Sequence, residues 1–397
     1  MWTRTSRAAP ETIAATHISI GILVWNEEKV IRAALQSLFG QSFFDRLAEQ
    51  NLKCEILCVA NGCTDRTAAI ASEVFAESAP SHRSISSARV VDVPERSKLN
   101  AWNLFVHGLS AKEAAYLFLM DGDIVLHHPD TLWNMCLALE NDSTATIAAG
   151  DHLKDIEFKE NKSLWDRISL ATSRMTETCD AQFSGQLYCI KAAVARNMYL
   201  PKDLVACEDG FLKTIACTYF LTRAPCDGRI VEAENASHIF QAYTSPADII
   251  RNQKRQMIGQ TIVHLLVDQH LKNWPLEQKL NFAETLQERE SADPLWLKRL
   301  IGEHLRQTRY FWRLFPGILT YRFQLWWQTR GMKKLLYLPA TLAGFVVSVI
   351  SSWMAWRFLR RGYINYWPDT QSPRLKGFVP GQKMPNRGSL ITDATQN

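Results

Sequence analysis

The sequence lacks the features that mark several common classes of protein. Its nine cysteines are scattered over 397 residues without a single CxxC pair, so zinc-finger spacing is absent. The net charge is only +5, and without an RNP-like stretch or a dense basic run no nucleic-acid partner is expected. The polar segment Met1–Thr16 has no apolar core of the kind found in signal peptides. We therefore expect reduced thiols and a cytosolic catalytic domain.

The chain does contain enough apolar sequence for a large folded core. Hydrophobic residues make up 47% and charged residues 21%. Apolar runs predict strands that alternate with amphipathic helices, and this alternation favours an α/β fold with a mostly parallel, doubly wound sheet. Strands are predicted at residues 17–25, 54–60, 88–93, 115–120, 146–150 and 229–238. The first helix is predicted to follow Asn26, which would be its N-cap, and to end at residue 38. A second helix is predicted to begin at residues 64–65. Further helices are predicted at 98–109, 164–175, 247–268 and 276–309, and the last of these is expected to be broken near 293–294.

The most informative feature is Asp121-Gly122-Asp123, directly after the apolar run 115–120. A buried strand that ends in this way delivers two carboxylates to the edge where open α/β sheets bind ligands. Two carboxylates one residue apart can hold a divalent cation that neutralises a diphosphate. Because Asp and Gly are also common in turns, an ordinary strand-end turn remains the alternative at this point.

Two further clusters of polar residues support the ligand interpretation. Lys98 and Asn103 begin a predicted helix just before the Asp-x-Asp strand, where a lysine can approach a diphosphate. Glu208 and Asp209 open a later helix, and a carboxylate there can act as general base towards an acceptor hydroxyl. One acidic pair for the leaving group and another for the nucleophile is the arrangement that sugar transfer requires.

The order of these segments resembles glycosyltransferase family 2, the inverting enzymes of GT-A fold. The similarity covers roughly residues 17 to 260. The matching segments are 24–28 (VWNEE), 61–67 (NGCTDRT), Lys98-x-x-Ala101-x-Asn103, Asp121-Gly122-Asp123, 184–188 (SGQLY) and Glu208-Asp209.

The resemblance implies a Rossmann-like, mostly parallel sheet flanked by helices and a nucleotide-sugar donor, usually a UDP-sugar. It implies Mn²⁺ or Mg²⁺ held through Asp123, with Asp121 near the ribose and diphosphate, and Asp209, beside Glu208, as catalytic base. The donor would contact Trp25, Asn26, Glu27, Asn61, Lys98, Asn103, Asp121 and Arg255, and the acceptor would contact Ser184, Gly185 and Gln186.

Several positions depart from the family pattern. Residues 60–63 read Ala-Asn-Gly-Cys where the family often has Asp-Asp-Gly-Ser, so an acid that can hold the base is replaced by Asn61. The Gln-x-x-Arg-Trp box of processive synthases is reduced to a segment in which Arg255 could still bind the diphosphate. Addition of single sugars is therefore expected. His238 is a candidate extra metal ligand or, alternatively, a packed histidine.

The stretch 335–356 contains no charged residue, and as a helix it would span roughly 33 Å. We expect it to cross the membrane, to re-enter it, or to be a core helix, with interfacial helices upstream. The basic residues of the tail favour a cytosolic location. The predicted domains are an extension (1–16), a GT-A catalytic domain (17–245), a helical extension with interfacial amphipathic helices (246–332), a transmembrane or re-entrant helix (333–361) and a loosely ordered basic tail (362–397).

These inferences predict a membrane-associated glycosyltransferase at the cytoplasmic face of the inner membrane, with a lipid or lipid-linked acceptor. One alternative is a catalytically silent membrane scaffold that retains the fold. Another is a sugar nucleotidyltransferase. Such enzymes need a glycine-rich, basic loop after the first strand, whereas this chain has Trp25-Asn26-Glu27-Glu28 there.

Overall fold

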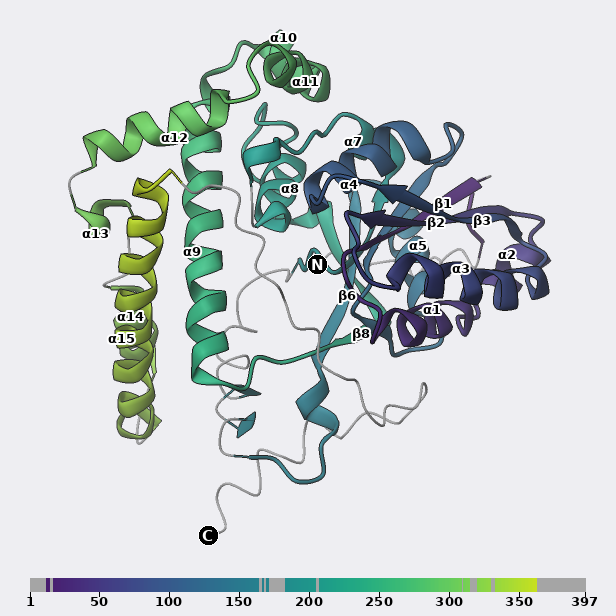
Figure 1. The fold of residues 1–397 in the computed structure, drawn as a ribbon, viewed down its shortest axis with the longest axis horizontal. Coiled ribbons are helices and arrows are strands. Elements are labelled where there is room, and N and C mark those ends of the chain that lie inside the picture. The colour runs from purple at the N-terminus through teal and green to yellow at the C-terminus, as the bar shows by residue number, and fades with distance from the viewer. Residues whose placement is uncertain are drawn as a thin grey trace, which may run out of the picture. The chain divides into compact units, whose positions relative to one another are not determined.

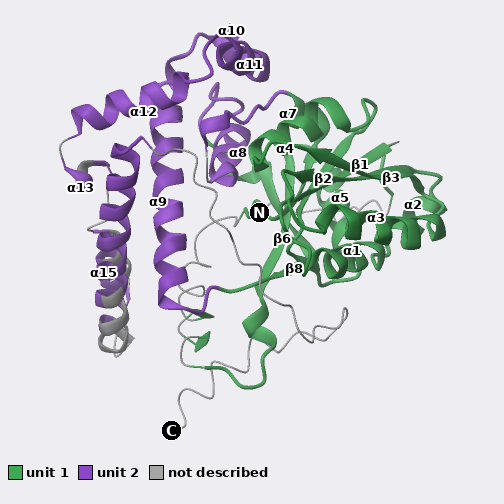
Figure 2. Cartoon of the chain, viewed as in Figure 1, with its two compact units in different colours: residues 1–196, 225–242, 370–397 green, residues 197–224, 243–369 purple. Residues whose placement is uncertain are grey.

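The computed structural model describes residues 12–14, 17–163, 166–167, 169–170, 183–204, 207–308, 310–314, 320–329 and 333–362. Most of the predicted N-terminal extension, the predicted tail from residue 363 and most of the predicted helix 164–175 lie outside these ranges. The chain divides into two compact units (Figure 2). Unit 1 contains residues up to 196 and 225–242, and unit 2 contains 197–224 and 243–369. Residues 197–224, placed within the predicted catalytic domain, thus group with the helical part.

Unit 1 is built on one eight-stranded sheet (Figure 1). The strands follow one another in the order β3-β2-β1-β4-β7-β6-β8-β5. The pairs β1–β2, β1–β4, β2–β3 and β6–β8 are parallel, and β4–β7, β6–β7 and β5–β8 are antiparallel. The predicted α/β fold with a mostly parallel sheet is confirmed. The strands are β1 (His17–Val24), β2 (Lys53–Asn61), β3 (Ile85–Val93), β4 (Tyr116–Asp121), β5 (Val125–Leu126), β6 (Ile147–Lys154), β7 (Leu187–Lys191) and β8 (Ile230–Phe240).

The central strands are buried on both faces, which explains their unbroken apolar sequence. Ile18, Ile20 and Ile22 of β1 and Phe118 of β4 are at most 1% exposed. Figure 1 shows α4 and α7 on one side of the strands and α1 and α3 on the other. The helices of unit 1 are α1 (Ile31–Phe39), α2 (Phe43–Glu49), α3 (Thr67–Ser78), α4 (Lys98–Leu104), α5 (Thr131–Asn141) and α7 (Ala192–Arg196).

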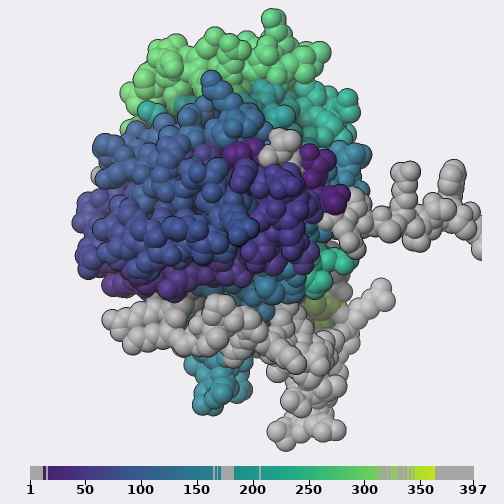
Figure 3. Space-filling model, turned by 90° about the vertical axis from the view of Figure 1, so that its right-hand side faces the viewer, coloured from purple at the N-terminus to yellow at the C-terminus, as the bar shows by residue number. Residues whose placement is uncertain are grey.

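One local prediction for unit 1 is wrong. Asn26 does not cap the first helix, because α1 begins only at Ile31 and Asn26 has a left-handed φ of 54°. Strand β7 was not predicted, since its five residues follow the polar 184–186 segment without a helical or alternating pattern. Figure 3 views unit 1 from the side of α2, α3 and β3 and shows the compact surface formed there by the purple and blue residues.

Unit 2 is helical in the part of the chain that is described. Its long helix α9 (Pro246–Gln269) agrees with the predicted helix 247–268, and Ser245 caps it by accepting a hydrogen bond from the Asp248 amide at 3.1 Å. The predicted break near 293–294 is also present, between α11 and α12. The other helices are α8 (Glu208–Cys217), α10 (Leu276–Leu280), α11 (Phe282–Ala292), α12 (Trp296–Gln307), α13 (Phe311–Leu314), α14 (Tyr321–Gln328) and α15 (Lys333–Arg360).

Helix α15 includes the stretch 335–356 that was predicted to span or re-enter the membrane. Among the helices in the described ranges, none combines the length and the apolar character needed to cross a bilayer. The predicted transmembrane helix is therefore not supported.

Candidate functional site in unit 1

The carboxyl end of β4 carries an ion pair between two predicted site residues. Lys98 Nζ lies 2.6 Å from one carboxylate oxygen of Asp121 and 2.9 Å from the other. Lys98 reaches this position because Ser97 caps α4, its Oγ accepting a hydrogen bond from the Asn100 amide at 3.2 Å. The two side chains are only 14% and 20% exposed, so the pair is weakly screened by solvent.

Gly122 allows the turn after β4 to approach β1 closely. Its amide donates to the carbonyl of Leu23 at 3.2 Å. A Cβ atom at position 122 would lie 2.3 Å from Cγ1 of Val24, a distance that real side chains do not tolerate. The glycine therefore holds Asp121 and Asp123 beside the end of β1. The side chain of Asp123 is half-buried in this turn.

A chain of hydrogen bonds connects Asp121 to His238. Because β7 runs antiparallel to β4, the Asp121 amide donates to the Gln186 carbonyl at 2.8 Å. Oε1 of Gln186 lies 3.3 Å from Nε2 of His238 and accepts a hydrogen bond from Ser184 Oγ at 3.3 Å. Sequence-predicted donor, acceptor and metal residues are thus brought into one network.

His238 is fully buried, and this fixes its protonation state. Burial, assisted by His152, lowers its pKa from 6.5 to about 3. The imidazole is therefore neutral at physiological pH. Its Nδ1 atom is buried and has no hydrogen-bond partner within the described ranges. On β8, His238 stands opposite Leu126, which is three residues beyond Asp123.

A second group of predicted donor residues lies at the ends of β1 and β2. The guanidinium of Arg96 lies over the indole of Trp25, 3.4 Å from the ring centroid. Asn61 is buried and its Nδ2 donates to the Val24 carbonyl at 2.7 Å, so its amide is oriented by the backbone. Gly62 has a φ of +71°, and a Cβ there would lie 2.9 Å from the Arg96 backbone.

The loops after β1 and β2 are fastened to each other by hydrogen bonds. Oδ1 of Asn26 accepts from the Thr64 amide at 2.8 Å. The Glu27 amide donates to Thr67 Oγ1 at 2.7 Å, and Thr67 Oγ1 in turn donates to Asp65 at 2.5 Å. These contacts give the two loops a fixed mutual geometry without any ligand.

The predicted donor residue Asn103 is buried on α4.

The predicted catalytic acids belong to unit 2. Glu208 and Asp209 form the first turn of α8, directly after Cys207, whose φ is 63°. Burial and the carboxylates of Asp209 and Glu208 raise the pKa of the Cys207 thiol to about 12, and Arg255 opposes this shift. The charges of Glu208, Asp209 and Arg255 therefore all act on the half-buried thiol of Cys207.

The predicted metal ligands are Asp121, Asp123 and His238. Asp121 is engaged by Lys98, and one nitrogen of His238 faces Gln186. Within the described residues, no three His, Cys, Asp or Glu side chains form a ready-made metal cage. Even so, the partly exposed carboxylate of Asp123 supplies the type of oxygen ligand that Mn²⁺ and Mg²⁺ prefer.

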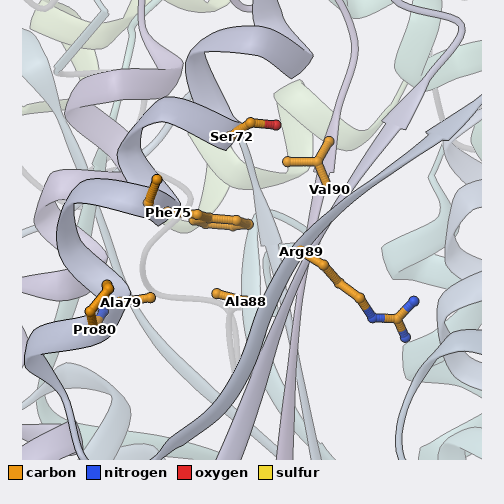
Figure 4. Close-up of a pocket in the computed structure, with 8 residues that line it drawn as sticks. Ser72, Phe75, Ala79, Pro80, Ala88, Arg89 and Val90 are labelled. Carbon is orange, nitrogen blue, oxygen red and sulfur yellow. The ribbon is translucent and has the colours of Figure 1, made fainter.

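A pocket of about 420 Å³ lies elsewhere in unit 1, between α3 and β3 (Figure 4). Phe75 of α3 and Val90 of β3 line it, and Arg89 stands at its side. None of its lining residues belongs to the predicted site. The pocket therefore adds nothing to the sugar-transfer interpretation.

Sequence reasoning missed Arg96 and Thr67. Arg96 stands two residues before Lys98, and its stacking on Trp25 joins segments 71 positions apart, which no local pattern could reveal. Thr67 was part of a matching segment, but its bridging of the Glu27 amide and Asp65 depends on how the loops meet.

The mostly parallel sheet carries a lysine-paired carboxylate at the end of β4, which is the edge where open α/β sheets bind ligands. Residues 19–188 match the family model described as glycosyl transferase family 2. The chain therefore contains a glycosyltransferase family 2 domain. The predicted family resemblance and the predicted enzyme class are confirmed.

Solved structures are similar to this chain at low identity. A mannosyltransferase from Pyrobaculum calidifontis, in complex with GDP-Man and Mn²⁺, is 16% identical, with a TM-score of 0.49 over 87% of this chain and 89% of that one. Glucosyl-3-phosphoglycerate synthase from Mycobacterium tuberculosis, in complex with Mn²⁺, UDP-glucose and phosphoglyceric acid, is 16% identical, with a TM-score of 0.42 over 66% and 82%. No curated protein sequence matches the chain.

Proposed function

We propose that this protein transfers a single sugar, with inversion, from a nucleotide-sugar donor to a hydroxyl of a lipid or lipid-linked acceptor. The observation that carries the proposal is the Lys98–Asp121 pair at the strand end of a glycosyltransferase family 2 domain. A lysine with a nearby acid at that edge provides both the positive charge and the metal-binding oxygens that a diphosphate needs.

The donor site is assigned to unit 1. Trp25, Glu27 and Asn61 line the nucleoside part, and Lys98 binds the diphosphate. We assign a UDP-sugar as donor, since Asn61 retains an oxygen that can accept a hydrogen bond from uracil while its Nδ2 is held by Val24.

A divalent cation, Mn²⁺ or Mg²⁺, would be held by Asp123, with Asp121 and His238 as further ligands. When bound, it supplies positive charge that stabilises the departing nucleoside diphosphate. The neutral state of His238 supports its inclusion, because only an unprotonated imidazole can bind a metal.

The acceptor is activated by Asp209. Its carboxylate takes the proton of the acceptor hydroxyl while that oxygen bonds to the anomeric carbon and the bond to the diphosphate breaks. Arg255, whose charge acts on Cys207 in opposition to those of Asp209 and Glu208, adds positive charge near this group. Ser184, Gly185 and Gln186 are assigned to the acceptor. We place the reaction at the cytoplasmic face of the membrane because of the aromatic and basic C-terminal helices.

The test is a thermal-shift screen of UDP-, GDP- and other nucleotide sugars, with and without Mn²⁺. A matching donor at 100 times its Kd stabilises the folded protein by about 2.7 kcal/mol, and this stabilisation should require the metal. Donor hydrolysis, followed by nucleotide release, should occur with the same sugar nucleotide. Absence of both stabilisation and hydrolysis across the whole panel would refute the proposed activity.

A further inference from the structure

The buried face of α15 consists mainly of small and hydroxylated residues. Its buried residues are Thr341, Ser348, Ser351 and Ser352, which are 0–6% exposed, together with Ala355 and, near the end of the helix, Leu359. Their positions fall on one side of a 3.6-residue helix. The hydroxyl of Ser352 is satisfied within the helix itself, donating to the Ser348 carbonyl at 2.7 Å. Helix α15 packs against α9, and in Figure 1 the two helices run side by side.

The opposite face of α15 is apolar and exposed. We call it the exposed stripe, and it consists of Leu342, Val346, Ile350 and Trp353, which are 48%, 53%, 41% and 44% exposed. The spacing of four, four and three residues places all four side chains along one line of the helix.

This distribution is the reverse of that in a helix facing water. In water, the apolar side chains of a surface helix are buried and the hydroxylated ones face solvent. In lipid, small and hydroxylated residues pack between helices, and large apolar residues face outward. The exposed stripe therefore has the composition of a surface in contact with hydrocarbon.

Basic and aromatic side chains border the stripe at both ends. Arg357 lies over Trp353 at 4.8 Å from the ring centroid, and Arg360 lies over Trp356 at 4.9 Å. At the other end, Lys334 lies 4.1 Å from the ring centroid of Trp327, which is 72% exposed. Tryptophan favours the boundary between headgroups and hydrocarbon, and arginine and lysine attract anionic lipids. Helix α15 contains no acidic residue to oppose this attraction.

We propose that the exposed stripe of α15 docks onto an anionic lipid bilayer, with the helix lying in the interface and Arg357 and Arg360 on the headgroups. The docking surface is distinct from the donor site and gives the lipid acceptor of the proposed function a physical basis. In that respect the inference rests on the proposed function, although the surface itself is argued from unit 2 alone.

The test uses the full chain and co-sedimentation with vesicles of phosphatidylcholine and phosphatidylglycerol. The triple variant Leu342→Gln, Val346→Gln, Ile350→Gln should lower the partition coefficient at least about tenfold, because three apolar side chains no longer enter the interface. The matched control is Leu276→Gln, Leu280→Gln, Leu295→Gln, which alters three comparably exposed leucines of the same unit and should bind as the unaltered protein does. Equal binding of all three proteins would overturn the proposal.

A second variant tests the charge requirement. Arg357→Gln, Arg360→Gln should lower binding to anionic vesicles by roughly 30-fold at low salt and leave weak binding to pure phosphatidylcholine unchanged. The control is Lys298→Gln, Arg306→Gln on α12, where both side chains are exposed. Equal losses in the two double variants would exclude a role for the arginines beside the stripe.

Two further measurements distinguish membrane docking from self-association, and docking from the proposed activity. Light scattering shows whether the triple variant is a monomer where the unaltered protein is a dimer. A loss of the dimer without a change in vesicle binding would assign the stripe to a second copy of the chain and overturn the proposal. The donor thermal shift is measured on the same proteins. If vesicle binding depends on the stripe but no donor stabilises the unaltered protein, docking is upheld and the proposed activity fails.

Discussion

At the scale of single residues, His238 shows how burial selects a protonation state. Its ring is inaccessible to water and lies 6.4 Å from the ring of His152, so a proton on it would be both desolvated and close to another basic group. The neutral ring is held instead by the side chain of Gln186. Folding thus keeps a potential metal ligand unprotonated in advance.

The neutral state of the buried His238 ring makes the free energy of unfolding depend on pH. The pKa of His238 is lowered to about 3 in the folded chain from 6.5, so between these values the unfolded chain binds a proton that the folded chain does not. The free energy of unfolding should therefore fall as pH decreases below about 6.5, by about 1.4 kcal/mol per unit from this group. Urea unfolding at several pH values checks this. In the variant His238→Gln, the free energy of unfolding should depend less steeply on pH, by the equivalent of about one proton. Equal pH dependence in the two proteins would contradict the lowered pKa of His238.

Sequence reasoning at this scale identified residue types more successfully than contacts. Lys98 and Asp121 were both predicted from their segments, and the structure pairs them. The stacking of Arg96 on Trp25 and the link from Gln186 to His238 were not predicted. Both join segments that meet only when the strands are assembled, and no spacing along the chain records such a meeting.

At the scale of elements, the close approach of β4 to β1 depends on Gly122. The substitution Gly122→Ala should destabilise the protein by about 1–3 kcal/mol, because the added methyl overlaps Val24. The control is Gly302→Ala on α12, where the added methyl points into open space beyond its own helix. That change should stabilise the helix by about 0.5–1 kcal/mol. Urea unfolding measures both, and a neutral Gly122→Ala would show that the turn can move.

Most elements of the sheet could be predicted because their apolar runs are long. Strands β1, β2 and β4 are buried on both faces and appear as mainly hydrophobic segments, interrupted by Ser19 in β1 and Glu55 in β2. Strand β7 escaped prediction because it is short and is defined by pairing with β4 and β6. The start of α1 was misplaced because the hydrogen bonds of Asn26 go to the neighbouring loop at Thr64, and not to the first turn of a helix.

At the scale of the whole molecule, the predicted chemistry is divided between two units. The predicted donor residues lie in unit 1 with the exception of Arg255, which lies in unit 2 together with Asp209. The sequence revealed both acidic pairs but not that residues 197–224 group with the C-terminal helices. That grouping depends on packing, for example on the hydrogen bond from Tyr199 to Glu290 of α11 at 2.7 Å.

The different roles proposed for Asp123 and Asp209 predict that substitutions of these two residues impair different steps of the reaction. Asp123→Ala should abolish the Mn²⁺-dependent part of donor stabilisation in a thermal-shift assay. Asp209→Asn should retain donor binding and lower turnover by about 10²–10⁴-fold, because only the proton transfer is removed. Calorimetric donor titration and nucleotide release measure the two effects. Unchanged donor affinity in Asp123→Ala would contradict its assignment to the metal.

The Lys98–Asp121 pair also determines what an approaching ligand meets. In the pair, the charges of lysine and aspartate cancel, so the strand end is less acidic than its sequence implies. A diphosphate that enters must compete with Asp121 for the ammonium group, and a cation must compete with Lys98 for the carboxylate. In the proposed function, a diphosphate that bound Lys98 would release the carboxylate of Asp121 for a cation, and a cation that bound Asp121 would release Lys98 for the diphosphate. The ion pair would then link the two binding events, so that donor and cation would each raise the affinity of the site for the other.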